Sequence, residues 1–494
     1  MSLINISNLT FAYEGSYDNI FENVNFQIDT NWKLGFTGRN GRGKTTFLNL
    51  LLGKHEYRGK ISASVKFQYF PIMSDKTKIT SVIIHEMSPG HQDWELQKEL
   101  SLLAVCHDVL SRPFETLSSG EQTKILLAAL FLNDNNFLLI DEPTNHLDAV
   151  GREIVSRYLG GKTGFILVSH DRAFLDGCVD HILSINRANI EVQRGNFSSW
   201  LANKERQDKF EFAENEKLKK DIKRLKKAAR QSGEWADRVE STKIGKGSAG
   251  VEKSIDRRAY IGEKSRRMQQ RRKNLENRQQ SAIEEKSKLL KNVEQADSLK
   301  ITQMLYHKQQ LLSLRDIGIL YGKKSICEGI SFDVNRGDRV ALYGRNGSGK
   351  SSIIKLICGE NISHRGEFAI GNGLQISYVS QGTSHLSGNL TDYARHHDID
   401  ESLFKAILHK LDFSRVQFEK DMNDFSGGQK KKVLIARSLS EKSHLLVWDE
   451  PLNFIDVLSR MQIELLLLEY KPTILFVEHD SVFCGKIATK KVML

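Results

Sequence analysis

The stretch GRNGRGKTT at residues 38–46 recurs as GRNGSGKSS at residues 344–352. Both copies fit the pattern G-x-x-x-x-G-K-[S/T], and each follows an apolar, strand-like run and precedes a helix-like run. In this context glycines let backbone N–H groups turn toward phosphate oxygens, and the helix N-terminus favours an anion. The two stretches therefore predict two phosphate-binding loops.

Three further motif pairs recur at nearly the same distance, which runs from 306 residues for Lys44 and Lys350 to 309 for His170 and His479. Such a constant offset indicates a tandem duplication. It predicts an α/β protein in which residues 1–200, the first repeat, and residues 306–494, the second repeat, flank an unrelated segment at 201–305. The pairs are LSSGE (117–121) with FSGGQ (425–429), LLIDEPTNHLD (138–148) with LVWDEPLNFID (446–456), and ILVSHD (166–171) with LFVEHD (475–480).

The motifs predict chemistry for each polar residue. The lysine is expected to bind the terminal phosphates, and the hydroxyl after it to ligate Mg²⁺. The apolar runs FLLIDE and LLVWDE predict buried strands that end in two acids, the first for Mg²⁺ and the second to orient or deprotonate the attacking water. The histidine after the next apolar run either senses phosphate or is structural. These residues are Lys44 and Lys350, Thr45 and Ser351, Asp141 and Asp449, Glu142 and Glu450, and His170 and His479.

LSSGE and FSGGQ resemble the signature motif of the ATP-binding cassette family. In that family two cassettes pack head to tail, with ATP between the phosphate loop of one and the signature of the other. The resemblance implies two composite ATP–Mg²⁺ sites, and it implies that Tyr13 and Tyr321 stack on adenine, although ordinary strand packing also accounts for either tyrosine. The further contacts implied are Gly38, Asn40, Gly41, Gly43 and Thr46 with Ser426, Gly427 and Gly428, and Gly344, Asn346, Gly347, Gly349 and Ser352 with Ser118, Ser119 and Gly120.

The repeats differ at positions that the family uses. Gln381 stands where the family has a glutamine that contacts Mg²⁺ and water, whereas Ile72 fills that place in the first repeat. We therefore expect the two sites to turn over ATP at different rates. The other differences, first repeat to second, are Thr144 to Leu452, His146 to Phe454 and Ser119 to Gly427.

The middle segment carries all the excess positive charge. Residues 201–300 hold 28 Lys and Arg against 17 Asp and Glu, which equals the net charge of +11 of the whole chain. Apolar residues at helical spacing predict a hairpin of two helices, over 203–240 and 263–297. The concentrated charge favours RNA contact over a solvated coiled coil. The candidate RNA contacts are Trp235, Lys246, Arg257, Arg258, Tyr260, Arg266 and Arg267.

Composition argues against membrane and secreted proteins. No run approaches the roughly 18–20 apolar residues of a membrane-spanning helix, and the start lacks the pattern of a secretory signal. The five cysteines are scattered and form no CxxC pair, which predicts free thiols in a reducing cytoplasm.

Fused cassettes of this kind resemble the F branch of the family, of which DEPTNHLD (141–148) is typical. The resemblance implies a cytoplasmic monomer whose cassettes pair within the chain, and a ribosomal partner contacted through rRNA and tRNA. The long linker is most similar to that of the Lsa-type resistance members, which protect ribosomes from lincosamides, streptogramin A and pleuromutilins. The alternatives are a housekeeping translation factor of the same branch and the ATPase subunit of a transporter.

Overall fold

The computed structural model describes residues 2–13, 19–72, 75–133, 135–145, 147–186, 189–241, 303–322 and 324–494, together with residues 270 and 273. The chain divides into two compact units. One comprises residues 1–200 and 298–494 and so holds both repeats, and the other comprises residues 201–297.

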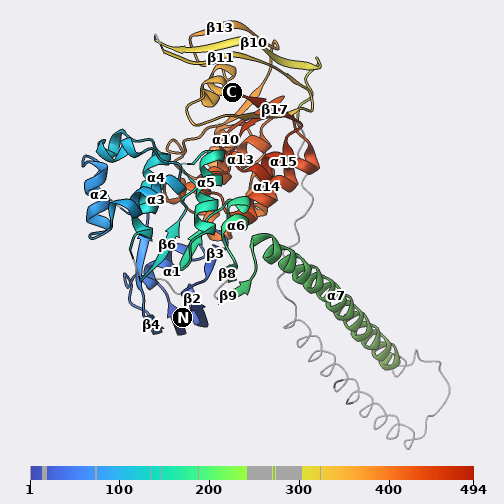
Figure 1. Cartoon of the computed structure of the whole chain (residues 1–494). Helices are drawn as coiled ribbons and strands as arrows, with labels where there is room; N and C mark the ends of the chain where they lie inside the picture. The colour runs from blue at the N-terminus through green and yellow to red at the C-terminus, as the bar shows by residue number, and fades with distance from the viewer. Residues whose placement is uncertain are drawn as a thin grey trace, which may run out of the picture. The chain divides into compact units, whose positions relative to one another are not determined.

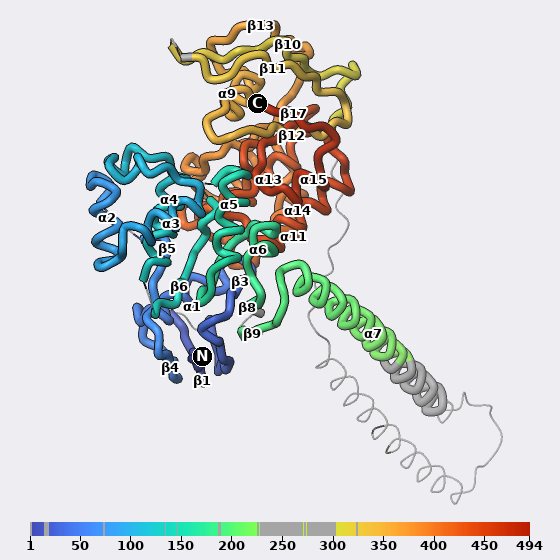
Figure 2. Tube along the Cα trace, in the orientation of Figure 1, coloured from blue at the N-terminus to red at the C-terminus, as the bar shows by residue number. Residues whose placement is uncertain are grey.

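Each repeat is built on a mainly parallel sheet (Figures 1 and 2). The first has the strand order β5-β6-β7-β3-β8-β9, in which β9 alone runs antiparallel to its neighbour, and the second has the order β14-β15-β16-β12-β17. Equivalent strands pair in the same way, since β3 lies between β7 and β8 as β12 lies between β16 and β17. The prediction of a duplicated α/β fold is confirmed. The strands are β3 (Lys33–Thr37), β5 (Lys66–Phe70), β6 (Asn136–Asp141), β7 (Phe165–Val168), β8 (His181–Asn186), β9 (Asn189–Arg194), β12 (Arg339–Tyr343), β14 (Ile376–Val379), β15 (Leu445–Asp449), β16 (Ile474–Val477) and β17 (Lys490–Met493).

An antiparallel sheet of three strands accompanies each parallel sheet, with the orders β2-β1-β4 and β11-β10-β13. In the first repeat Phe21 of this sheet and Phe47 of helix α1 belong to one buried cluster, and their ring centroids lie 6.0 Å apart. This packing fixes the helix that follows the phosphate loop. The strands are β1 (Leu3–Phe11), β2 (Phe21–Asp29), β4 (Arg58–Ser62), β10 (Gln310–Tyr321), β11 (Lys324–Asn335) and β13 (His364–Ile370).

The strands that end in the paired acids are apolar on both faces. Residues 137–140 of β6 and the whole of β15 are buried, as expected of a parallel strand covered by helices on each side. Trp448 is fully buried, and its indole N–H donates to Ser438 Oγ at 2.9 Å. The acids therefore emerge at the end of a rigid strand.

The motifs also begin helices. Ser118 caps α4 and Ser426 caps α13, each in a capping box with the residue three positions on. Asp148 caps α5 and Asp456 caps α14. The helices of the two repeats are α1 (Lys44–Leu51), α2 (Thr80–Met87), α3 (Asp93–Leu102), α4 (Ser119–Phe131), α5 (Ala149–Gly160), α6 (Arg172–Cys178), α9 (Lys350–Ile357), α10 (Leu390–His396), α11 (Glu401–Lys410), α12 (Arg415–Phe418), α13 (Gly427–Ser440), α14 (Val457–Tyr470) and α15 (Ser481–Ile487).

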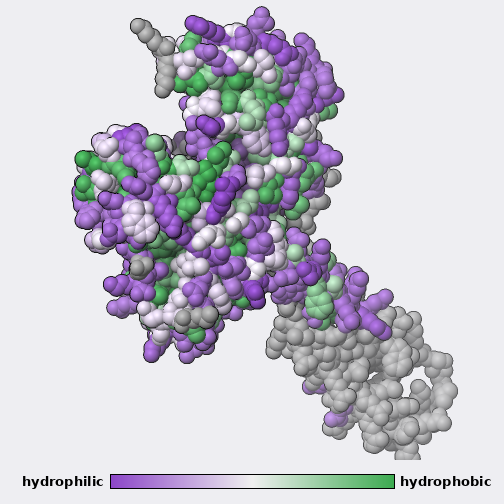
Figure 3. All heavy atoms as spheres, viewed as in Figure 1, coloured by the Kyte–Doolittle hydropathy of each residue, from purple (hydrophilic) through white to green (hydrophobic). Residues whose placement is uncertain are grey.

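Helix α7 (Phe197–Ser241) forms the first part of the middle segment and is 45 residues long, which corresponds to about 65–70 Å. It includes the first helix of the predicted hairpin, whereas the predicted second helix lies outside the described residues apart from 270 and 273. Hydrophilic residues cover most of the described surface of α7 in Figure 3. No described helix is both long and apolar enough to cross a membrane.

Candidate functional site

The two phosphate loops have the same local geometry. Gly43 and Gly349 have φ of 94° and 93°, a left-handed conformation that only glycine adopts readily, and helices α1 and α9 begin at the next residue. Lys44 Nζ donates to Gly38 O at 2.6 Å, and Lys350 Nζ donates to Gly344 O at 2.9 Å. Both ammonium groups thus lie inside the loop whose backbone would surround a phosphate.

The hydroxyl and carboxylate oxygens beside each lysine are suitable ligands for Mg²⁺. Thr45 Oγ1 donates to Asp141 Oδ2 at 3.4 Å, and Ser351 Oγ donates to Asp449 Oδ1 at 3.2 Å. Hydroxyl and carboxylate oxygens are the ligands that Mg²⁺ prefers in proteins. In the first repeat the Tyr69 hydroxyl also donates to Asp141 Oδ2 at 2.9 Å, a contact that sequence analysis missed.

A cavity of about 880 Å³ surrounds Lys350 and is lined by both repeats. This volume is within the range of about 300–1,000 Å³ common for small-molecule sites. We call it the Lys350 site. The second repeat contributes its phosphate loop, Gln381, Glu450 and His479, and the first contributes Ser118, Ser119 and Gly120. The structure therefore brings together the second phosphate loop and the first signature.

A cavity of about 810 Å³ lies beside Lys44 and is lined by Thr45, Asp141, Glu142 and His170. We call it the Lys44 site. From the second repeat its lining contains Phe454, whereas Ser426, Gly427 and Gly428 are absent from the lining residues that the structure describes.

Direct contacts between the repeats explain this difference. Asn40 Nδ2 of the first phosphate loop donates to Phe454 O at 2.7 Å. A Cβ atom placed on Gly428 would be 2.9 Å from the same Asn40 nitrogen, so the signature glycine lies against the loop. Arg39 also forms an ion pair with Asp412. The second signature thus lies close to the first phosphate loop.

Both glutamates have a backbone conformation that is rare for residues other than glycine. Their φ angles are 51° for Glu142 and 46° for Glu450. Hydrogen bonds hold this geometry, because Glu142 N donates to Val168 O at 2.9 Å and Glu450 N donates to Val477 O at 3.1 Å. Strained backbone that the surroundings maintain is concentrated at functional sites.

The Glu450 carboxylate has several polar neighbours. Gln381 Nε2 donates to Oε2 at 2.8 Å, Asn453 Nδ2 donates to the same oxygen at 2.6 Å, and His479 Nε2 lies 3.6 Å from Oε1. Burial alone would raise the pKa of Glu450, but these neighbours outweigh it and lower the pKa to about 2. The group is therefore ionised at neutral pH.

The Glu142 carboxylate has fewer described hydrogen-bond donors around it than the Glu450 carboxylate. His170 Nε2 lies 3.2 Å from Glu142 Oε1, and that oxygen has no hydrogen-bond partner among the described residues. Burial, with Asp141 beside it, raises the pKa of Glu142 to about 8. Burial and the Lys44 charge hold the pKa of His170 well below its usual value. Both shifts favour the neutral form of the side chain.

The model of the ABC transporter family matches residues 21–145 and 327–453, a little over half of the chain. The chain belongs to this family. With two cassettes in one chain, it is an ATP-binding protein of the ABC-F type, and its cassettes are ATPase domains that bind and hydrolyse ATP. The first and second repeats are called the first and second cassettes below.

Relatives align over nearly the whole chain. The ribosome protection protein VmlR of Bacillus subtilis is 26% identical over 490 residues, covering 98% of this chain and 85% of VmlR. The erythromycin resistance ATP-binding protein MsrA of Staphylococcus epidermidis is 28% identical over 473 residues, covering 93% and 91%. The ATP-binding protein Uup of Buchnera aphidicola is 28% identical over 513 residues, covering 99% and 80%.

A solved structure has the same fold. The archaeal ribosome recycling factor aABCE1, in complex with the stalk protein aP1, superposes with a TM-score of 0.65 at 17% identity and covers 98% of this chain and 87% of its own. At this identity the likeness supports the two-cassette fold alone.

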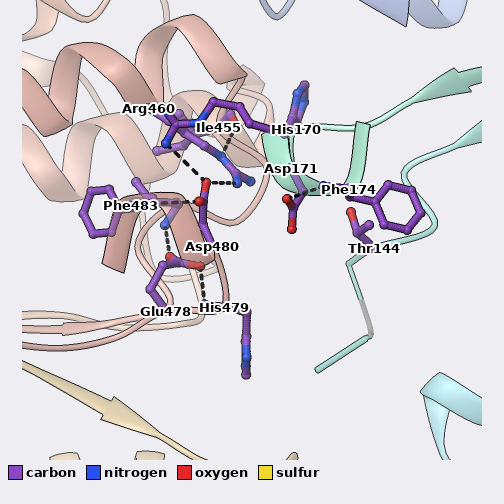
Figure 4. A network of polar contacts seen from close by, with 12 residues as sticks. Thr144, His170, Asp171, Phe174, Ile455, Arg460, Glu478, His479, Asp480 and Phe483 are labelled. Carbon is purple, nitrogen blue, oxygen red and sulfur yellow. Dashed lines mark hydrogen bonds and ion pairs between the residues drawn. The ribbon is translucent and has the colours of Figure 1, made fainter. Parts of the chain in front are cut away.

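The exchange of Thr144 for Leu452 between the cassettes has a structural reason. In the first cassette the Thr144 hydroxyl lies 3.2 Å from Ser169 Oγ. In the second, Glu478 replaces that serine and accepts hydrogen bonds from Leu452 N at 3.1 Å and His479 N at 2.8 Å (Figure 4). Because the Glu478 carboxylate accepts its hydrogen bonds from backbone N–H groups, it does not need a hydroxyl partner at position 452. The counterpart of Phe454, His146, lies outside the described residues.

Lys431 was missed in the sequence. It is fully buried, and its Nζ donates to Ser380 O at 2.9 Å and to Glu450 O at 3.1 Å, while burial lowers its pKa to about 8. Thr123 takes its place in the first cassette. The sequence feature that could have revealed Lys431 is the run Lys430–Lys432, because it continues directly into the apolar part of α13.

The two tyrosines have matching positions. The Tyr13 hydroxyl lies 2.9 Å from Thr46 Oγ1, and the Tyr321 hydroxyl donates to Ser352 Oγ at 3.3 Å. Both rings are about half exposed, and Tyr321 lines the Lys350 site. Adenine stacking stays a prediction. Among the candidate RNA contacts, Trp235 is described by its backbone alone, and Lys246, Arg257, Arg258, Tyr260, Arg266 and Arg267 lie outside the described residues.

Proposed function

We propose that this ATPase binds the ribosome and protects it from antibiotics of the peptidyl-transferase centre, the Lsa-type activity. The observation that carries the proposal is the alignment with VmlR and MsrA over more than nine tenths of the chain, which includes the middle segment. Docking near the tRNA exit site, with the middle segment reaching toward rRNA and the tRNA end, would displace lincosamides, streptogramin A or pleuromutilins.

The site residues then have the following roles. Lys44 and Lys350 bind the terminal phosphates, and each signature completes the site of the opposite cassette. Thr45 and Asp141 in one site, and Ser351, Asp449 and Gln381 in the other, would hold Mg²⁺, which would neutralise charge on the phosphates when bound.

The water-activating residues complete the assignment. Glu450 accepts a proton from the attacking water and His479 steadies the phosphate, and Glu142 and His170 occupy the same positions in the first cassette. Hydrolysis opens the cassettes and releases the ribosome. The protein acts as a cytoplasmic monomer, with the cassettes at 1–200 and 306–494 and the linker at 201–305.

The double variant Glu142→Gln with Glu450→Gln tests this cycle. We expect it to bind ATP normally and to co-sediment with ribosomes in ATP, because the closed state forms but cannot hydrolyse. Glu153→Gln is the matched control, since Glu153 is an exposed acid on α5 that contacts only Arg157 among the described residues. A double variant that stays in the supernatant with ATP would contradict a ribosomal cycle.

The similarity to Uup supports a second candidate, a housekeeping translation factor with the same ATP cycle and no role in drug protection. Expression in a drug-sensitive host separates the two. Higher tolerance to lincosamides or pleuromutilins supports protection, whereas unchanged tolerance together with ribosome trapping supports the housekeeping role.

Exposed basic residues on α7 give the proposal an electrostatic test. Lys220, Lys223, Arg224 and Lys227 all have exposed side chains. If they contact rRNA phosphates, replacing all four by Gln is expected to weaken ribosome binding and to reduce the slope of log K against log salt by about 3–4, since each phosphate contact contributes about 0.7–0.9.

Ribosome binding measured at several salt concentrations reads this slope. The charge-matched control replaces four exposed basic residues of the first cassette by Gln, namely Arg58, Lys60, Lys98 and Arg157. Equal slopes for the two quadruple variants would show that α7 makes no specific phosphate contacts.

A further inference from the structure

A buried ion-pair cluster joins the two cassettes directly behind their histidines. Arg172, the first residue of α6, follows His170 by two positions and is 4% exposed. Its Nη1 donates to Glu464 Oε2 at 3.2 Å, and its Nη2 donates to Oε1 of the same carboxylate. Glu464 lies in α14 of the second cassette and is 3% exposed. The contact is a two-pronged guanidinium–carboxylate pair, which fixes orientation as well as distance.

Arg172 also approaches a second acid of the opposite cassette. Its Nη2 lies 3.8 Å from Asp480 Oδ2. Asp480 directly follows His479, is fully buried, and accepts a hydrogen bond from Phe483 N at 2.9 Å that fixes the start of α15. Helices α6 and α15 are in contact. Each histidine therefore lies within two positions of a residue of this cluster, Arg172 in the first cassette and Asp480 in the second.

Inside each cassette an arginine contacts the acid that follows the histidine. Arg152 Nη1 donates to Asp171 Oδ2 at 2.9 Å, and Arg460 Nη1 donates to Asp480 Oδ2 at 3.3 Å. Figure 4 shows Arg460 reaching Asp480, with the His170–Asp171 segment of the first cassette facing them. Each arginine also donates its Nε to a backbone carbonyl of the segment after the catalytic glutamate, Arg152 to Leu147 and Arg460 to Ile455.

Among the described residues, the Arg172–Glu464 pair has no counterpart at the equivalent positions of the other cassette. Arg152 and Arg460 are equivalent at an offset of 308 residues, at which Glu464 corresponds to Ser156. Arg172 corresponds to Ser481 at the offset of 309 residues that relates the two histidines. The internal arginine–aspartate pairs therefore belong to each cassette separately. The Arg172 contacts are an addition that joins them.

We propose that Arg172 is a positioning residue that couples the two ATP sites, by holding Asp480 and Glu464 of the second cassette to the segment that carries His170. The proposal rests on the assigned roles of the two histidines. A buried charge separates from its partner only at high cost, so the two segments shift together. A shift of His170 on binding the γ-phosphate thereby changes the position of His479, and the effect is reciprocal.

Arg172→Gln tests the coupling, with Arg157→Gln as the matched control, because Arg157 is an exposed arginine of α5 that contacts only Glu153 among the described residues. ATP turnover is measured against ATP concentration in the full chain. We expect a Hill coefficient above 1 in the unmodified protein and in Arg157→Gln, and a value near 1 in Arg172→Gln.

Site-disabled variants measure the same coupling directly. In the Arg157→Gln background, adding Lys44→Ala is expected to change the ATP affinity of the Lys350 site within the roughly 5–150-fold range of ordinary allosteric coupling. In the Arg172→Gln background the same change should leave that affinity unaltered. Reduced stability alone would not produce this difference.

Three results would overturn the inference. They are a Hill coefficient near 1 in the unmodified protein, the same Hill coefficient in Arg172→Gln and Arg157→Gln, and the same response to Lys44→Ala in both. If Arg172→Gln does not fold, Glu464→Gln replaces it, because the amide keeps the shape and removes the charge. Unchanged nucleotide binding in Lys44→Ala would instead refute the assigned ATP sites.

Discussion

Glu450→Gln is expected to lower ATP turnover of the whole protein by about 10²–10⁴-fold, and Glu142→Gln by less than about 10-fold. The reason lies in how the two carboxylates are held. Gln381 and Asn453 both donate hydrogen bonds to Glu450 Oε2, which orient it and stabilise its charge. Glu142 Oε1 lacks a hydrogen-bond partner among the described residues, and Ile72 stands where Gln381 would be.

The two sites also differ in how ATP can reach them. The Lys350 site opens into a cavity of about 880 Å³ lined by both cassettes. At the Lys44 site, Asn40 is hydrogen-bonded to Phe454 O of the second cassette, and the described lining residues do not include the second signature. We therefore expect the Lys350 site to perform most of the turnover.

Phosphate release at saturating ATP, measured for the two single variants and for Glu153→Gln, checks this prediction. Both glutamine variants should still bind nucleotide, since neither change touches a phosphate-loop residue. Equal losses of turnover in the two variants, or a larger loss in Glu142→Gln, would mean that the hydrogen bonds to the glutamate do not determine the faster site.

The features that could be predicted from the sequence lie on short, contiguous motifs. The phosphate loops around Lys44 and Lys350, with the helices that follow them, and the acids at the ends of β6 and β15 each depend on neighbours within a few positions. Duplication strengthened the prediction, because a coincidence at one position does not recur some 308 residues later. The head-to-tail pairing came from the family resemblance, not from the residues alone.

Contacts between distant segments were not predictable in this way. Arg172 and Glu464 are 292 positions apart, and nothing in either local sequence indicates the other. Tyr69 appeared as one more residue of a strand, yet its hydroxyl binds Asp141. Lys431 belonged to a basic run that suggests a solvated helix face, whereas the fold buries it under Glu450. Each depends on which elements the fold packs together.

Asp456→Asn is expected to destabilise the protein by about 3–5 kcal/mol at neutral pH, because it leaves a buried lysine without its charge partner. Asp456 is fully buried, and Lys432 Nζ lies 3.4 Å from its Oδ2. Lys432 is itself 5% exposed and otherwise donates to Leu411 O at 2.8 Å. Asparagine can still cap α14, so the loss of stability measures the contribution of the Asp456 charge and not that of the helix cap.

The same group makes stability depend on pH. Burial alone would raise the pKa of Asp456, but Lys432 and the hydrogen bond from Ser459 N outweigh it and hold the pKa well below its usual value of about 3.9. A depressed folded-state pKa stabilises the protein above the unfolded value, and this contribution is lost as pH falls through the folded value. Stability of the unmodified protein should therefore fall below about pH 4, and this component should be missing in Asp456→Asn.

Asp148→Asn is the matched control in the first cassette. Asp148 caps α5 through Gly151 N at 2.8 Å, but it is partly exposed and forms no ion pair with Lys124 in the described structure. Its replacement should cost about 1 kcal/mol or less, because asparagine caps a helix about as well as aspartate. Urea unfolding of both variants at pH 7 and at pH 3–4 measures the difference. Equal destabilisation by the two changes would show that the Lys432–Asp456 pair contributes no more than an ordinary helix cap.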